Sequence, residues 1–171
     1  CGWFGLGGGA PGWGGGGGRG GGGRGGGAAD DAAPGDDVQA TEIRFELLDG
    51  GTATIGALLD RPAVVNFFAS WCTPCVAEMP ALEAVQRQRP DVVFIGLAFN
   101  DTRSRAREIV ADTGVTYTTG LDPESAIGNS LGILGMPTTF FITSDGEVAY
   151  QHTGGLTAEQ IAERIETHLA S

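Results

Sequence analysis

The segment that most constrains the fold runs from residue 63 to residue 88. It begins with AVVNFF (63–68), a near-continuous apolar run typical of a strand that is covered on both faces of a sheet. The motif Trp71-Cys72-Thr73-Pro74-Cys75 follows almost directly. After it, Cys75, Met79 and Leu82 recur at the spacing of one helix face. We therefore expect a buried strand, a short connection, and a helix over 72–88 with both cysteines near its amino end.

The rest of the chain after residue 42 alternates between strand and helix patterns. Further strands are expected at 43–48, 52–55, 92–98, 138–142 and 148–152, and further helices at 102–113, at 124–131 and from Thr157 onward. The first two strands flank Gly50-Gly51 and predict a hairpin, and Thr157 with Gln160 has the spacing of a capping box. Pro80 should kink the first long helix. This order predicts an α/β fold with a mixed sheet.

The amino-terminal part of the chain has a different composition. Of the 31 glycines in the sequence, 19 lie in residues 1–35, and such a segment has few side chains to bury. We predict a disordered Gly-rich tether over residues 1–37 and one domain over residues 38–171, a common domain size. Cys1 resembles the lipid-carrying first residue of a mature bacterial lipoprotein, and a truncation that begins at a cysteine by chance is the alternative.

The charge and the hydropathy of the chain argue against a nucleic-acid partner and against a membrane-spanning helix. It has 10 Arg, no Lys and 21 acidic residues, which give a net charge of −11. Binding to a phosphate backbone needs clustered basic residues, so we expect no nucleic-acid partner. No run of 18 apolar residues occurs, so we expect no membrane-spanning helix.

Two cysteines separated by two residues at the start of a helix suggest redox chemistry. The free N–H groups and the helix dipole stabilise a thiolate on Cys72, whereas Cys75 lies one turn further on the apolar face. Zinc needs four ligands, and haem attachment needs a histidine where Val76 stands, so we expect no metal. A Cu(I)-binding or Cu(I)-delivery domain that uses the two thiolates is a rival hypothesis.

Four segments carry a resemblance to a known family. They are VVNFFASWCTPCVAEMPALE, the turn Leu121-Asp122-Pro123, LGILGMPTTFFI and DGEVAYQHTGGLTAEQI. Together they resemble the thioredoxin superfamily over residues 38–171, and within it the extracytoplasmic TlpA/ResA-like group, which includes the cytochrome c maturation thioredoxins. The resemblance implies a three-layer sandwich with a mixed central sheet, helices on both faces and an N-terminal β-hairpin. It also implies an extra strand–helix insertion, supplied by residues near 99–128.

The resemblance also implies roles for individual residues. Pro137 is expected to be a cis-proline that faces the disulfide, with an ordinary trans proline as the alternative, and Met136 is expected to offer its backbone to a bound peptide. Glu78 is expected to lie near the thiols and to tune their proton transfer, with a solvated surface position as the alternative. Asn66 stands where cytosolic thioredoxins carry a buried Asp. The expected substrate-binding residues are Trp71, Thr73, Pro74 and Met136, and neither His152 nor His168 is expected to be catalytic.

These observations lead to one functional expectation with stated rivals. We expect a thiol–disulfide oxidoreductase in which Cys72 attacks and Cys75 releases the mixed disulfide, with no cofactor besides the cysteine pair. The expected partners are protein dithiols or disulfides, apocytochrome c among them, and a membrane electron donor for the reductive direction. An extracytoplasmic disulfide oxidase is the alternative within the same chemistry, and a peroxiredoxin fits the motif less well. We expect a monomer outside the cytoplasm, with a lipid anchor if Cys1 is the mature first residue.

Overall fold

The computed structural model describes residues 39–170. The predicted tether over residues 1–37 and the predicted lipid attachment at Cys1 lie outside these residues. None of the helices in the described part is both long and apolar enough to cross a membrane.

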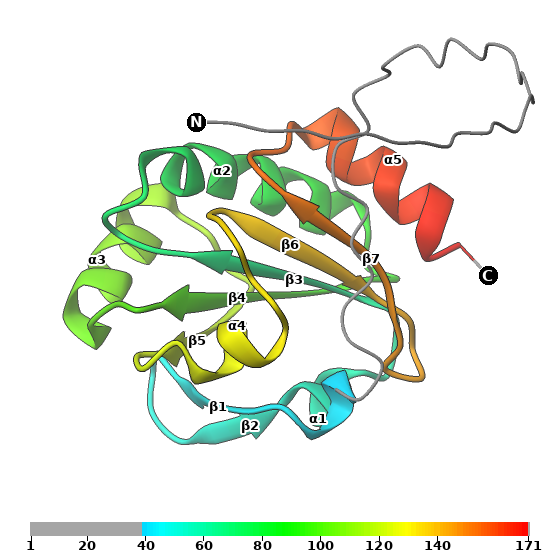
Figure 1. The fold of residues 1–171 in the computed structure, drawn as a ribbon. Coiled ribbons are helices and arrows are strands. Elements are labelled where there is room, and N and C mark those ends of the chain that lie inside the picture. Colours follow the sequence, from blue (N-terminus) through cyan, green and yellow to red (C-terminus); the bar gives the residue numbers. More distant parts are fainter. Residues whose placement is uncertain (1–38, 171) are drawn as a thin grey trace, which may run out of the picture.

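The described residues form one seven-stranded mixed sheet in the order β2-β1-β5-β4-β3-β6-β7 (Figure 1). Strands β3, β4 and β5 are parallel, whereas β1, β2, β6 and β7 join the sheet in antiparallel pairs. The strands are β1 (Arg44–Leu47), β2 (Thr52–Thr54), β3 (Ala63–Phe68), β4 (Val93–Phe99), β5 (Thr118–Asp122), β6 (Thr138–Ile142) and β7 (Val148–Thr153). The helices are the 3₁₀ turn η1 (Ala40–Glu42), α1 (Ile55–Leu58), α2 (Thr73–Gln88), α3 (Arg103–Thr113), α4 (Ala126–Ser130) and α5 (Ala158–His168).

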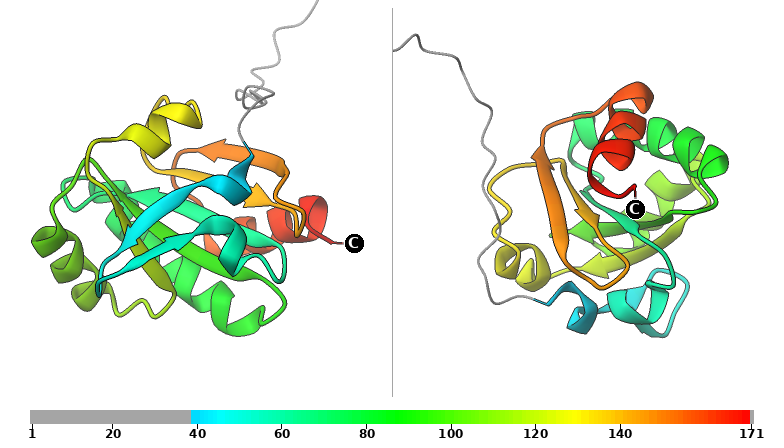
Figure 2. Two further views of the ribbon diagram at one scale, coloured as in Figure 1. Left: turned by 90° about the horizontal axis from the view of Figure 1, so that it is seen from below. Right: turned by 90° about the vertical axis from the view of Figure 1, so that its right-hand side faces the viewer.

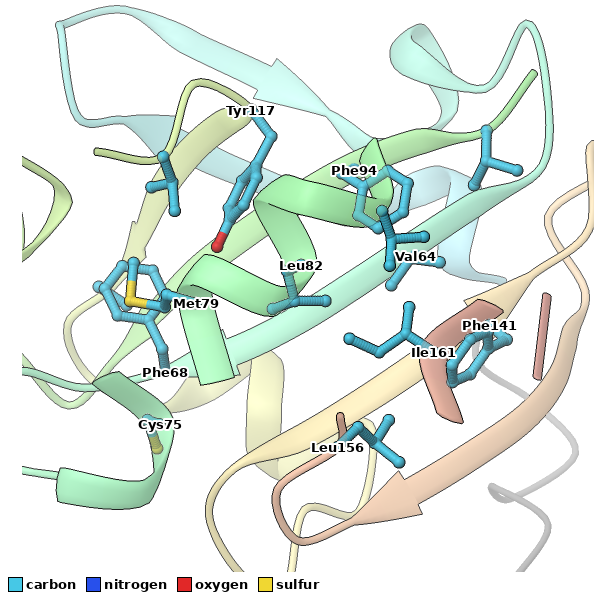
Figure 3. Close-up of a cluster of buried hydrophobic side chains, with 14 of the residues drawn as sticks. Val64, Phe68, Cys75, Met79, Leu82, Phe94, Tyr117, Phe141, Leu156 and Ile161 are labelled. Carbon is cyan, nitrogen blue, oxygen red and sulfur yellow. The ribbon is translucent and has the colours of Figure 1, made fainter. Parts of the chain in front are cut away.

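The sheet separates two hydrophobic cores, because successive side chains of a strand point to opposite faces. In β3, Val64 and Phe68 pack under helices α2, α3 and α5, whereas Val65 and Phe67 pack on the side of η1, α1 and α4. Figures 1 and 2 show this division of the helices, and Figure 3 shows the α2-side core, in which Met79 and Leu82 lie over the sheet. The expected three-layer sandwich with a mixed sheet is confirmed.

The β-hairpin is present, but its second strand is shorter than the sequence predicts. Strand β2 ends at Thr54, and Ile55, expected in the strand, begins helix α1 instead. The Thr54 side chain accepts a hydrogen bond from the N–H of Ala57 at 3.1 Å, which starts the helix, and Ile55 is fully buried. The prediction for Ile55 is therefore wrong, since an N-cap and a buried contact decide that turn.

The segment near residues 99–128, where an extra strand and helix were expected, contains α3, β5 and α4. Strand β5 lies between β4 and β1, so it joins the hairpin to the parallel part of the sheet. Helix α4 is shorter than the predicted 124–131. The buried carboxylate of Asp122 accepts hydrogen bonds from the N–H groups of Ile127 and Gly128, at 3.1 and 2.8 Å, and so fixes the first turn.

Two further predictions concern individual helices. The capping box at Thr157 and Gln160 is present, with both of its hydrogen bonds formed. Helix α2 spans Thr73 to Gln88 with Pro80 inside it, and the kink expected at Pro80 stays a prediction.

Candidate active site

Strand β3 and helix α2 place the two cysteines at the edge of the α2-side core. Cys72 is the N-cap residue of α2, and Pro74 lies in its first turn, where the missing N–H has no helical partner to lose. Cys72 and Cys75 form a disulfide, with their Cα atoms 5.3 Å apart. Cys72 keeps 6% of its surface exposed, whereas Cys75 has none. The pair is therefore asymmetric, with one sulfur at the surface side and one in the core beside Phe68 and Met79 (Figure 3).

The loop after β4 holds the turn that precedes Cys72. The buried carboxylate of Asp101 accepts hydrogen bonds from the Ser70 N–H at 2.6 Å and from the Ser70 hydroxyl at 3.0 Å. The indole N–H of Trp71 donates to the carbonyl oxygen of Asn100 at 3.2 Å, and Asn100 itself has a φ of 48°. These contacts fix the backbone before the disulfide while leaving half of the Trp71 surface exposed.

The loop before β6 faces the same region. The peptide bond between Met136 and Pro137 is cis, and the chain enters β6 at Thr138 directly after it. The Thr138 hydroxyl donates to the carbonyl oxygen of Gly135 at 2.7 Å and closes the loop.

A groove of about 610 Å³ lies between this loop and the cysteine turn. Its lining contains no charged side chain and consists of Trp71, Cys72, Thr73, Pro74, Phe99, Ile133, Leu134, Gly135 and Met136. Leu134 is 91% exposed at this groove. The residues expected at the substrate-binding surface (Trp71, Thr73, Pro74 and Met136) all lie along it. An uncharged groove beside a disulfide suits an apolar stretch of polypeptide.

Glu78 is buried one turn after Cys75 on α2, with only 3% of its surface exposed. Its Oε1 accepts a hydrogen bond from the N–H of Leu156 at 2.9 Å, and its Oε2 accepts one from the side-chain amide of Asn66 at 3.1 Å. Burial raises the pKa of Glu78 to about 7, while these two hydrogen bonds act in the opposite direction. A carboxyl group with this pKa can both take up and give away a proton near neutral pH.

Two residues of the site, Asp101 and Leu156, were not among those expected from the sequence. Asp101 could have been found as an acid two residues after the carboxyl end of a buried strand, whereas nothing in the sequence marks the N–H of Leu156 as a partner of Glu78. The two histidines lie away from the groove lining: His152 is in β7, and His168 ends α5 and stacks on Tyr150 with ring centroids 4.3 Å apart. Within residues 39–170 no group of three or more His, Cys, Asp or Glu side chains is placed to hold a metal ion.

Curated relatives of this chain share the same chemistry in their names. The chain is 34% identical over 108 residues to the thiol:disulfide interchange protein HelX of Rhodobacter capsulatus. This match covers 63% of this chain and 60% of HelX. It is 32% identical over 120 residues to the thiol:disulfide interchange protein DsbE of Allochromatium vinosum. This match covers 70% of this chain and 66% of DsbE. The chain thus spans less than two thirds of the length of these relatives.

The fold has close counterparts among solved structures. The structure of DsbF from MTB superposes with a TM-score of 0.71 at 26% sequence identity, covering 76% of this chain and 97% of DsbF. The fold is thioredoxin-like, as the resemblance implied. The sequence profile of the Redoxin family matches residues 29–167. That match extends over most of the chain and includes the strands, the helix and the loops around the disulfide, so this chain belongs to the Redoxin family.

Proposed function

We propose that the protein is a thiol–disulfide oxidoreductase that exchanges the Cys72–Cys75 disulfide with partner proteins. The observation that carries this proposal is the asymmetric disulfide at the start of α2, with Cys72 beside the uncharged groove and Cys75 in the core. Relatives named as thiol:disulfide interchange proteins support it.

The proposed reaction transfers two electrons from the reduced pair to a substrate disulfide. The Cys72 thiolate attacks one substrate sulfur, a mixed disulfide forms, and the first substrate thiolate leaves and takes a proton. Cys75 then gives up its proton and attacks the Cys72 sulfur. This step forms the Cys72–Cys75 disulfide and releases the second substrate thiolate, which is protonated in turn. No bound cofactor is needed, because the cysteine pair itself carries the electrons.

Glu78 is the proposed acceptor of the proton that Cys75 loses. Three features support this role: its position one turn after Cys75, its burial, and its pKa of about 7. Asn66 lacks a group that could accept a proton in its place.

The groove supports a protein segment as the substrate. An extended peptide could lie between Trp71 and the Met136 backbone, with apolar side chains over Phe99 and Leu134. The resemblance to the TlpA/ResA-like group supports the reductive direction outside the cytoplasm, with apocytochrome c thiols as substrate and a membrane electron donor that recharges the pair.

The test is reduction of a protein disulfide by the purified chain. The reduced protein should cleave the disulfides of insulin in the presence of dithiothreitol faster than dithiothreitol alone, and Cys72→Ser should abolish the difference. Equilibration of the pair with glutathione buffers then gives the direction, because a potential well below that of glutathione indicates a reductant and one above it an oxidase. Stoichiometric copper without any acceleration would instead favour the Cu(I)-binding hypothesis.

A further inference from the structure

Asn66 is a polar residue in the middle of β3, whose other five residues are apolar. All six residues of β3 are buried, and Asn66 lies between Val64 and Phe68 on the α2 side of the sheet. A buried amide in such a place is unfavourable unless its polar atoms are hydrogen-bonded. The partners of this side chain therefore reveal what it does.

The amide nitrogen of Asn66 uses both of its hydrogens. Nδ2 donates to Glu78 Oε2 at 3.1 Å and to the hydroxyl oxygen of Thr139 at 3.0 Å. Thr139 is directly opposite Asn66 in the β3–β6 pair. The other amide atom, Oδ1, is buried and accepts no hydrogen bond from the described residues.

This arrangement suits the ionised form of Glu78, because both carboxylate oxygens accept hydrogen bonds. When Glu78 takes up a proton, the proton must sit on Oε2, because Oε1 already faces the Leu156 N–H. An O–H on Oε2 would then point at the Asn66 N–H, and two donors would face each other without an acceptor. Rotation of the Asn66 amide by half a turn removes the conflict, since Oδ1 and Nδ2 exchange places in nearly the same volume.

The rotated amide keeps one hydrogen bond to Glu78 and one to Thr139, while Nδ2 takes the buried position in which Oδ1 has no partner among the described residues. Oδ1 accepts from the protonated Glu78 and from the Thr139 hydroxyl, which can turn from acceptor to donor. The bond from Leu156 to Oε1 is unchanged. We propose that Asn66 is a positioning residue whose side-chain amide reverses each time Glu78 gains or loses a proton, so that the buried carboxyl group is hydrogen-bonded in both forms.

Few other titratable groups near Glu78 could cause the Asn66 amide to reverse as the pH changes. The pKa of Glu78 is set by burial and by its bonds to Leu156 and Asn66, with no contribution from an ionised side chain among the described residues. The charge of Glu78 acts on the phenol of Tyr117. Burial raises the pKa of this phenol and keeps it protonated. On α2 itself, the nearer cysteine is held in the disulfide.

The consequence for disulfide exchange rests on the proposed function. If Glu78 takes the Cys75 proton and later returns it, a reversible partner keeps either state from losing a hydrogen bond. Thr139 is two residues after Pro137, in the strand that follows the loop bordering the groove.

The test uses the oxidised chain of residues 1–171 and NMR, so it does not depend on any reductase activity. The Glu78 side-chain carboxyl carbon should titrate between pH 5 and pH 9. The Asn66 amide protons should show contacts to the Thr139 side chain at pH 9 that weaken at pH 5 with the same midpoint. In the Glu78→Gln control the amide contacts should not change with pH.

Two outcomes would overturn the proposal. One is an Asn66 amide with the same contacts at both pH values while the Glu78 carboxyl titrates, and the other is a Glu78 that keeps one protonation state over this range. As a second measurement, Asn66→Asp keeps the shape but removes the donor and adds an acid. It should raise the Glu78 midpoint by more than about one pH unit, and an unchanged midpoint would show that the side chain at position 66 does not control Glu78. Loss of insulin reduction with an intact amide response would count against the proposed function alone.

Discussion

The two cysteines of the candidate site differ in access although only two residues separate them. Cys72 is at the N-cap of α2 beside the groove, and Cys75 is enclosed by the α2-side core. A helix N-terminus stabilises a thiolate, and an apolar environment disfavours one. These two environments support the proposed roles, in which Cys72 attacks and Cys75 releases the mixed disulfide.

This assignment predicts unequal reactivity in the reduced protein. Cys72 should react with iodoacetamide roughly tenfold faster than Cys75 at pH 7, because a lowered pKa gives it a larger thiolate fraction. Cys75→Ser should accumulate a mixed disulfide with a substrate protein, and the matched Cys72→Ser should not. Mass spectrometry of the trapped species identifies the cysteine involved, and trapping only through Cys75 would contradict the assignment.

Glu78 makes stability depend on pH. Its pKa is about 7 in the folded state, against 4.5 for an unperturbed Glu, so between these values the folded state binds more protons than the unfolded state. The contribution of Glu78 to the free energy of unfolding is therefore largest below about pH 4.5, and we expect it to decrease by about 3 kcal/mol as the pH rises through 7.

Glu78→Gln should remove this decrease. Urea unfolding of the oxidised protein at pH 5 and pH 8 measures it, as the difference between the pH responses of the native chain and the variant. Comparison with the variant cancels the contribution of His152, whose pKa is lowered by burial and which acts in the opposite direction. Equal pH responses of the native chain and the variant would show that the pKa of Glu78 is close to its ordinary value.

At the scale of the elements, β5 connects the hairpin to the rest of the sheet through a very close contact. A Cβ on Gly120 would lie 2.3 Å from the Phe45 ring and 2.8 Å from the carbonyl oxygen of Glu46 in β1. Only a glycine lets these two strands approach in this register.

Gly120→Ala should therefore lower the free energy of unfolding by about 1–3 kcal/mol, as overpacking does. Gly155→Ala is the matched control, because a Cβ there meets no atom within 4 Å. Denaturant melts of both variants test the contact, and a Gly120→Ala protein as stable as the control would show that β1 moves aside without cost.

At the scale of the whole molecule, the described residues already contain two cores, one on each face of the sheet. The Gly-rich segment adds few side chains that could extend either core. Deleting residues 2–37 should leave the thermal midpoint within about 4 °C of the full chain, a change of less than 1 kcal/mol. Insulin reduction by the two chains should also agree, and a larger drop in either measurement would show that the segment packs on the domain.

The sequence by itself determined the elements whose patterns are local. The apolar run of β3, the WCTPC motif, the start of α2 with Pro74 in its first turn and the capping box at Thr157 each depend on neighbouring residues, so each could be predicted from the chain alone. The resemblance then supplied the layer arrangement and pointed to Glu78 and Pro137.

Only the tertiary structure decided which distant groups meet. Leu156 and Asn66 reach Glu78 from 78 and 12 residues away, and Asp101 holds Ser70 across 31 residues. The helical start at Ile55 likewise follows from its burial in the second core rather than from its β-branched side chain. Contacts of this kind depend on the order in which strands pair in the sheet and on which helices cover them. For that reason the hydrogen-bond partners of Glu78 could be identified only when β3, α2 and the loop before α5 were placed together.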